Sequence, residues 1–150
     1  MKHYFKTVRW EFFDPVQTYP ELVGKDKIVV RSPIDIVNNF SFLFTHQVRE
    51  RFVVLWLNSA NRVTGYEIIT EGLLNSSLAH PREVFRGAIV ATSASIILAH
   101  NHPSGNPEPS QEDISITKQI VEAGKIIGIP VHDHIIFADS YTSFAERGII

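Results

Sequence analysis

The sequence predicts an α/β fold, because segments typical of buried strands alternate along the chain with segments typical of helices. Short apolar runs rich in β-branched residues indicate the strands, whereas capping residues or prolines before longer periodic stretches indicate the helices. With 150 residues, the chain is predicted to form one domain large enough for a real core. It is 44% hydrophobic and 20% charged, a composition that excludes a disordered chain.

The first third of the chain is predicted to hold an N-terminal extension and one helix. Residues 1–27 are interpreted as the extension, with some strand character over 8–13. Ser32 is a typical N-cap and Pro33 suits the first helical position. A helix is therefore expected from these residues to about residue 46.

The next segment is predicted to form a hairpin followed by a loop and a helix. Residues 51–57 are apolar and β-rich, which indicates a buried strand. A turn over 58–61 and a second strand over 62–70 complete the hairpin. Polar residues at 75–77 are typical of a loop, and the proline that follows is expected to open a helix over 82–91.

The last third of the chain repeats the alternation of strand and helix. A short apolar strand is predicted over 95–99, and a helix over 110–127 is expected to end near Gly128. Residues 130–137 indicate another strand, and 143–147 are predicted to form a final short helix.

Composition excludes several classes of protein. No apolar run approaches the ~20 residues that span a bilayer, and the first residues lack the apolar core of a secretory signal. The chain has no cysteine, so disulfides and thiolate zinc sites are excluded. The default location is therefore the cytoplasm. A net charge of −2 leaves little surplus for phosphate contacts, and the basic pair Arg49 and Arg51 encloses Glu50.

The most informative stretch is a pair of histidines after the apolar run at 95–99. His100 and His102 are two residues apart, so in a strand they would share one face. Asp113 follows at the start of the next predicted helix. Two imidazoles and a carboxylate suit a catalytic zinc with its fourth position open to water, whose pKa the metal would lower to ~7.

A structural interpretation of the same residues stands beside this one. Ser110 with Asp113 three residues later resembles an N-cap box, and the Pro/Gly-rich segment before Ser110 is ordinary loop composition. The two interpretations are compatible, because a capped helix start is a rigid place for a metal ligand.

The spacing of these residues resembles that of a known family. His100, His102, Pro103, Ser110 and Asp113 follow the pattern His-x-His-Pro, six residues, Ser, two residues, Asp, which is similar to the JAMM motif of JAB1/MPN metalloproteases. The segments that make the chain resemble the bacterial RadC-like branch of this family are 80–85, 100–105 and 133–136. The resemblance covers roughly residues 28–148.

The resemblance implies a fold, a cofactor and an activity. Residues 28–150 would form one JAB1/MPN-like, cytidine-deaminase-like α/β sandwich with a central mixed sheet flanked by helices. His100, His102 and Asp113 would hold one Zn²⁺ per chain. The family's catalytic glutamate lies on an upstream strand, so the resemblance assigns acid/base catalysis to Glu50, and it implies that the Ser110 hydroxyl stabilises the oxyanion.

Several nearby residues offer alternatives. Glu50, between two arginines at a strand edge, is also typical of a solvated salt-bridge residue. Glu83 in the first turn of its helix is the rival base, and His80 is expected to shape a loop. His132 and His134 would share a strand face, which permits a second metal site. They and Asp133 are better interpreted as strand-end polar residues, with Asp133 or His134 bonding near the zinc site.

The sequence therefore predicts a zinc peptidase or isopeptidase, with a peptide or an isopeptide-linked protein as substrate. One alternative is a protein associated with DNA repair, as RadC-like proteins have been, acting on or with nucleic acid. The first 27 residues are too short for the additional N-terminal region of longer members, which disfavours DNA repair and favours a stand-alone domain. The other alternative is a non-catalytic MPN-type scaffold, which the intact motif disfavours. Oligomeric state is not predicted.

Overall fold

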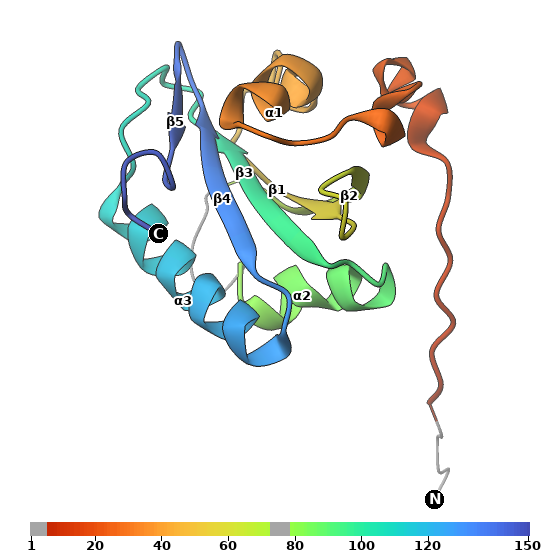
Figure 1. Cartoon of the computed structure of the whole chain (residues 1–150). Helices are drawn as coiled ribbons and strands as arrows, with labels where there is room; N and C mark the ends of the chain where they lie inside the picture. The colour runs from red at the N-terminus through yellow and green to blue at the C-terminus, as the bar shows by residue number, and fades with distance from the viewer. Residues whose placement is uncertain (1–5, 73–78) are drawn as a thin grey trace, which may run out of the picture.

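The computed structural model describes residues 6–72 and 79–150, and its centre is one five-stranded sheet with the strand order β2-β1-β3-β4-β5 (Figure 1). The α-helices and strands are, in chain order, α1 (Pro33–Phe40), β1 (Arg51–Leu57), β2 (Val63–Glu71), α2 (Pro81–Val90), β3 (Ser95–Asn101), α3 (Gln111–Ile127), β4 (Val131–Phe137) and β5 (Tyr141–Ser143). Four short 3-10 helices precede β1: Pro15–Gln17, Pro20–Leu22, Lys25–Lys27 and Ser41–Leu43.

The sheet is mixed. Strand β1 runs antiparallel to both of its neighbours, β2 and β3, and it pairs Phe52 with His100. Strands β3 and β4 are parallel, and β5 returns antiparallel to β4. The predicted α/β class with a central mixed sheet is confirmed, as is the hairpin formed by the first two strands.

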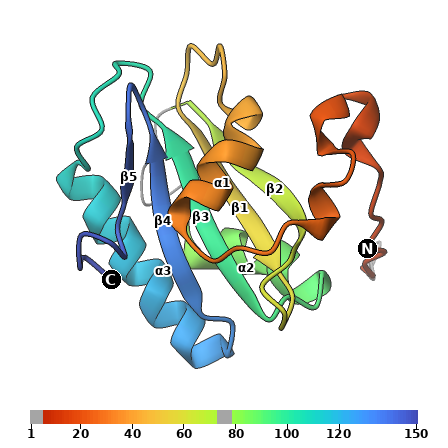
Figure 2. The ribbon, with the colours of Figure 1, turned by 45° about the horizontal axis from the view of Figure 1, so that its top comes forward.

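Helices cover both faces of the sheet, with α1 on one face and α2 and α3 on the other (Figure 2). Successive residues of a strand point to opposite faces, so β1 supplies two cores. Phe52 and Val54 pack on the α2–α3 side, whereas Val53 and Leu55 pack on the α1 side. Every residue of β1 is buried, which explains why its sequence is a continuous apolar run rather than an alternating one.

Strand β3 follows the same alternation, which determines the face of the sheet on which His100 lies. Ile96 and Leu98 belong to the α2–α3 core, and His100 has the same parity. The strand is longer than the predicted 95–99 and continues through Asn101. His100 therefore lies within the sheet, fully buried, on the face that carries α3.

Two predicted helices are wrong in extent or in kind. The helix expected to reach residue 46 ends at Phe40, whose φ of −127° departs from the helical value, and the 3-10 helix Ser41–Leu43 follows it. The helix expected over 143–147 is absent: Ser143 ends β5, and a turn follows in which Gly148 has a φ of 68°.

The N-terminal residues also differ from expectation. Residues 8–13 form no strand, since no other described strand pairs with them. The loop predicted at 75–77 lies outside the described residues. Within the described parts of the chain, no helix combines the length and the apolar character needed to cross a membrane.

Candidate metal centre

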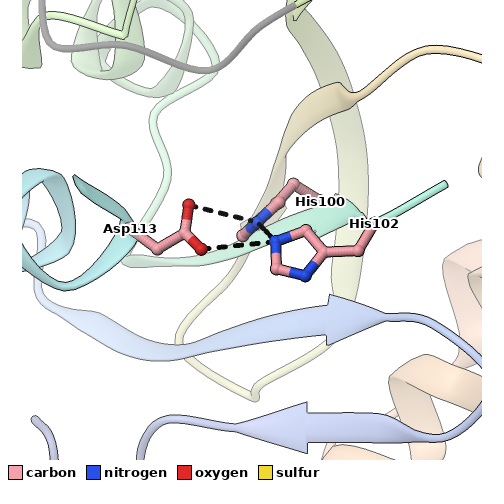
Figure 3. A group of neighbouring side chains, drawn as sticks. All are labelled: His100, His102 and Asp113. Carbon is pink, nitrogen blue, oxygen red and sulfur yellow. Dashed lines mark hydrogen bonds and ion pairs between the residues drawn. The ribbon is translucent and has the colours of Figure 1, made fainter. Parts of the chain in front are cut away.

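Three side chains that can bind a metal ion meet where β3 ends and α3 begins (Figure 3). The Nε2 atoms of His100 and His102 are 2.9 Å apart. The two carboxylate oxygens of Asp113 lie 3.4 Å from Nε2 of His100 and 3.3 Å from Nε2 of His102. Within residues 6–72 and 79–150, these residues form the only group of three or more histidine and acidic side chains positioned to hold an ion.

Asp113 owes its orientation to the start of α3. Ser110 caps the helix, and its hydroxyl accepts a hydrogen bond from the Asp113 backbone N–H at 3.0 Å. In return, the Ser110 backbone N–H donates to Oδ2 of Asp113 at 2.7 Å. This reciprocal capping box leaves the carboxylate facing the two histidines. The structural and the chemical interpretations of the Ser-x-x-Asp pattern therefore hold together in one structure.

The charge state of Asp113 suits a cation ligand. Burial alone would raise the pKa of the Asp113 carboxyl, but the adjacent His100 imidazole and the hydrogen bond from the Ser110 backbone N–H outweigh burial. That pKa consequently lies well below its usual range, so the carboxylate stays ionised at neutral pH.

His102 presents a free lone pair to the same point. Its Nδ1 lies 2.7 Å from the backbone carbonyl oxygen of Asn106. A carbonyl can only accept, so Nδ1 carries a hydrogen and Nε2 is the nitrogen available to a metal. Two imidazole nitrogens and a carboxylate thus converge on one point. Such a set of ligand atoms fits a metal cation.

The predicted base, Glu50, lies directly before β1 and is half-buried. Because Phe52 pairs with His100, Glu50 two residues earlier has the parity that directs a side chain to the His100 face. Its backbone carbonyl accepts a hydrogen bond from the N–H of Gly72 at 2.7 Å. Glu50 is not a member of the metal-binding group, and its catalytic role, like that of Ser110, stays a prediction.

Asn101 is a residue that the sequence analysis missed. It lies between the two histidines, and it is only 5% exposed. Its side-chain oxygen accepts from the Arg51 backbone N–H at 2.7 Å, and its side-chain nitrogen donates to the Arg49 carbonyl at 3.1 Å. The amide therefore spans both neighbours of Glu50 and fixes that segment to β3. The motif gave no signal for this role, which depends on the pairing of β1 with β3.

We expect Asn101→Ala to lower the free energy of unfolding by about 1–3 kcal/mol, because it leaves buried backbone groups without partners. Urea denaturation measures this change. The exposed Asn38→Ala on α1 is the control, with an expected change within about 0.5 kcal/mol. Zinc content should not change, since Asn101 is not in the metal-binding group. Equal stability of the two variants would contradict the bridging role.

The rival residues are used elsewhere in the structure. Glu83 forms ion pairs with Arg82 at 3.6 Å and Arg86 at 3.2 Å on α2. His80 caps α2 by accepting a hydrogen bond from the Arg82 backbone N–H.

The three polar residues at the start of β4, His132, Asp133 and His134, lie on two sides of the strand. His134 is fully buried, and its Nε2 lies 2.7 Å from Nδ1 of His100. Asp133 instead accepts hydrogen bonds from the Ser143 hydroxyl and the Ala145 N–H, and so it holds the C-terminal segment. His132 is exposed.

Arg51 belongs to the interior rather than to a basic surface. It is 8% exposed, pairs with Glu71 at 2.7 Å, and donates to the Tyr19 hydroxyl at 3.0 Å. Of the basic pair Arg49 and Arg51, only Arg49 therefore offers an exposed side chain to a phosphate.

The fold and the site together define a class: an α/β protein whose central strand ends in a His-x-His pair facing an aspartate in the first turn of the next helix, with side chains that can hold a metal ion. The model of the RadC-like JAB domain matches residues 30–149. The chain therefore belongs to the RadC-like JAB domain family, and the resemblance noted in the sequence is confirmed.

Named relatives agree with this assignment. The chain is 49% identical over 125 residues to a UPF0758 protein of Moorella thermoacetica, which covers 83% of this chain and 55% of the relative. It is 40% identical over 139 residues to a UPF0758 protein of Methanosarcina mazei, covering 92% of this chain and 61% of the relative. A UPF0758 protein of Salinibacter ruber is 48% identical over 126 residues, with coverages of 83% and 54%. The chain thus spans little more than half the length of these curated relatives.

Proposed function

We propose that this protein is a zinc-dependent metallohydrolase that cleaves amide bonds, as a peptidase or an isopeptidase. The observation that carries the proposal is the convergence of two imidazole nitrogens and one carboxylate, from His100, His102 and Asp113, on a single point. Zinc is favoured over magnesium or calcium, because two of the three ligands are imidazoles and hard cations prefer oxygen. One ion per chain would occupy the site and leave a coordination position for substrate chemistry.

Zinc in this site would polarise a carbonyl group and supply a water acidified to a pKa of ~7. Glu50 would take the proton from that water and later give it to the leaving amine. The position of Glu50 supports this role, because β1 aligns it with the His100 face. The Ser110 hydroxyl accepts the Asp113 N–H and still has its own hydrogen, which it would donate to the carbonyl oxygen as negative charge develops there.

A peptide or isopeptide-linked protein is the substrate class that suits these groups. The nitrogen leaving group of an amide needs a proton, which a single carboxylate can deliver. Phosphodiester cleavage more often uses paired metals, and the described residues hold one metal-binding group. The burial of Arg51 also reduces the basic surface for nucleic acid. The cysteine-free chain needs no oxidising compartment, so we place the activity in the cytoplasm.

The test is to offer the zinc-loaded protein peptides, lysine-linked isopeptides and DNA side by side. We expect cleavage of an amide substrate, followed by mass spectrometry of the products, with DNA left intact. A chelator should stop the reaction, and added zinc should restore it. Zinc-dependent cleavage of DNA, with every amide intact, would refute the proposal.

A further inference from the structure

A row of buried hydrogen bonds leads from His100 back to the helix that carries Asp113. Nδ1 of His100 lies 2.7 Å from Nε2 of His134, and Nδ1 of His134 lies 2.6 Å from the Thr117 hydroxyl. The hydroxyl donates to the backbone carbonyl of Asp113 at 2.6 Å. His100, His134 and Thr117 are each 0% exposed, so water does not compete for these bonds.

The carbonyl at the end of the row fixes every hydrogen along it. A carbonyl can only accept, so the single hydrogen of the Thr117 hydroxyl points to Asp113. The hydroxyl oxygen must then accept from Nδ1–H of His134. The neutral His134 ring consequently has a bare Nε2, which accepts from Nδ1–H of His100. A neutral His100 ring with its hydrogen on Nδ1 has a bare Nε2, and that is the nitrogen that faces Asp113 and His102.

The surroundings of His134 keep its ring neutral and in place. His134 is fully buried, and burial lowers the pKa of its imidazole well below the ordinary value. A neutral ring carries one hydrogen, as the row requires. The rings of Phe52 and Phe144 pack against it, with centroids 5.7 and 4.6 Å away.

We propose that Thr117 and His134 are positioning residues that hold His100 in the Nδ1–H tautomer and so keep its Nε2 available to the metal. The inference rests on the proposed function, since it takes His100 as a zinc ligand. It adds a link between two ligands of one centre: α3 supplies the Asp113 carboxylate directly, and through the Asp113 carbonyl and Thr117 it also sets the proton on His100. Residues that bond to the outer nitrogen of a ligating histidine commonly fix its tautomer and orientation.

Thr117→Val tests this row of hydrogen bonds, called the relay below, with almost no change in the shape of the side chain. Thr117→Ser keeps the hydroxyl. In the valine variant, Nδ1–H of His134 would face a methyl group, so we expect the His134 hydrogen to move to Nε2. Long-range proton–nitrogen NMR correlations of the metal-free full chain report which ring nitrogen carries it. Wild type and Thr117→Ser should show Nδ1–H at His134, and Thr117→Val should show Nε2–H.

Zinc affinity, measured by competition with a chromogenic chelator, is the second readout. Thr117→Val should bind zinc about 10- to 100-fold more weakly, whereas Thr117→Ser should stay close to wild type. Ile120→Val, a buried change one turn along α3, controls for lost packing and should not alter affinity. Nε2–H at His134 in the wild type, or equal zinc affinity of the valine and serine variants, would overturn the relay. If the wild type itself bound no zinc, the proposed function would fail, while the NMR readout would still decide the relay.

Discussion

The double variant His100→Ala/His102→Ala is expected to lose zinc, whereas the wild type should hold close to one ion per chain. Removing both imidazoles leaves Asp113 as the sole member of the metal-binding group. A single carboxylate cannot provide the nitrogen ligands that distinguish a zinc site from a weak cation site. Elemental analysis of the purified protein after dialysis measures the content directly.

Two further variants separate metal loss from misfolding. His100 is fully buried and its replacement could disturb the core, but the His102 side chain is 11% exposed. His102→Ala alone should therefore remain folded by circular dichroism and still lose zinc. His132→Ala removes an exposed histidine outside the group and should retain full zinc content. Stoichiometric zinc in the double variant would show that these histidines are not the ligands.

The residues of the candidate site could be found in the sequence because their relations are local. His100 and His102 are two apart, and Ser110 and Asp113 belong to one helix start, so strand parity and capping chemistry group each pair, and the resemblance to the JAMM motif joins the two pairs. The loop that joins the two pairs is short, and this limits how far apart they can lie.

The supporting residues could not be found in this way, because their roles depend on strand pairing. Asn101 reaches Arg49 and Arg51 across the β1–β3 ladder, and His134 meets His100 through the parallel pairing of β3 and β4. Nothing in the spacing of these residues predicts that register. Thr117 in particular is typical of an ordinary helical residue until His134 is placed beside it.

The fold departs from the sequence prediction for a related reason. Propensity and caps located strands β1 to β4 and the long helix α3, including its end at Gly128, which adopts a φ of 81°. The helix after Ser32 ended early, where Phe40 leaves the helical φ and the 3-10 helix Ser41–Leu43 begins. Ser143, which was expected to begin a helix, instead ends β5, and β5 pairs with the edge of β4. That pairing is a tertiary contact, which local propensity does not predict.

Glu50→Gln is expected to abolish amide hydrolysis while leaving zinc in place. Glutamine keeps the shape of the side chain but cannot exchange a proton, and general acid–base catalysis typically contributes about 100- to 10,000-fold to a rate. Glu50 lies outside the metal-binding group, so elemental analysis should find wild-type zinc. The measurement is kcat/KM on whichever amide substrate the zinc-loaded wild type cleaves.

Glu83→Gln is the matched control, because it makes the same chemical change at the rival carboxylate. Glu83 is paired with Arg82 and Arg86 on the surface of α2, and exposed pairs of this kind contribute little to stability. This variant should therefore keep both zinc and activity. If Glu50→Gln were active and Glu83→Gln inactive, the proton transfer would be assigned to Glu83 on α2 instead of Glu50. Loss of zinc in Glu50→Gln would instead show that Glu50 is a metal ligand. Strand β1 would then direct a fourth coordinating group, rather than the base, toward the His100 face.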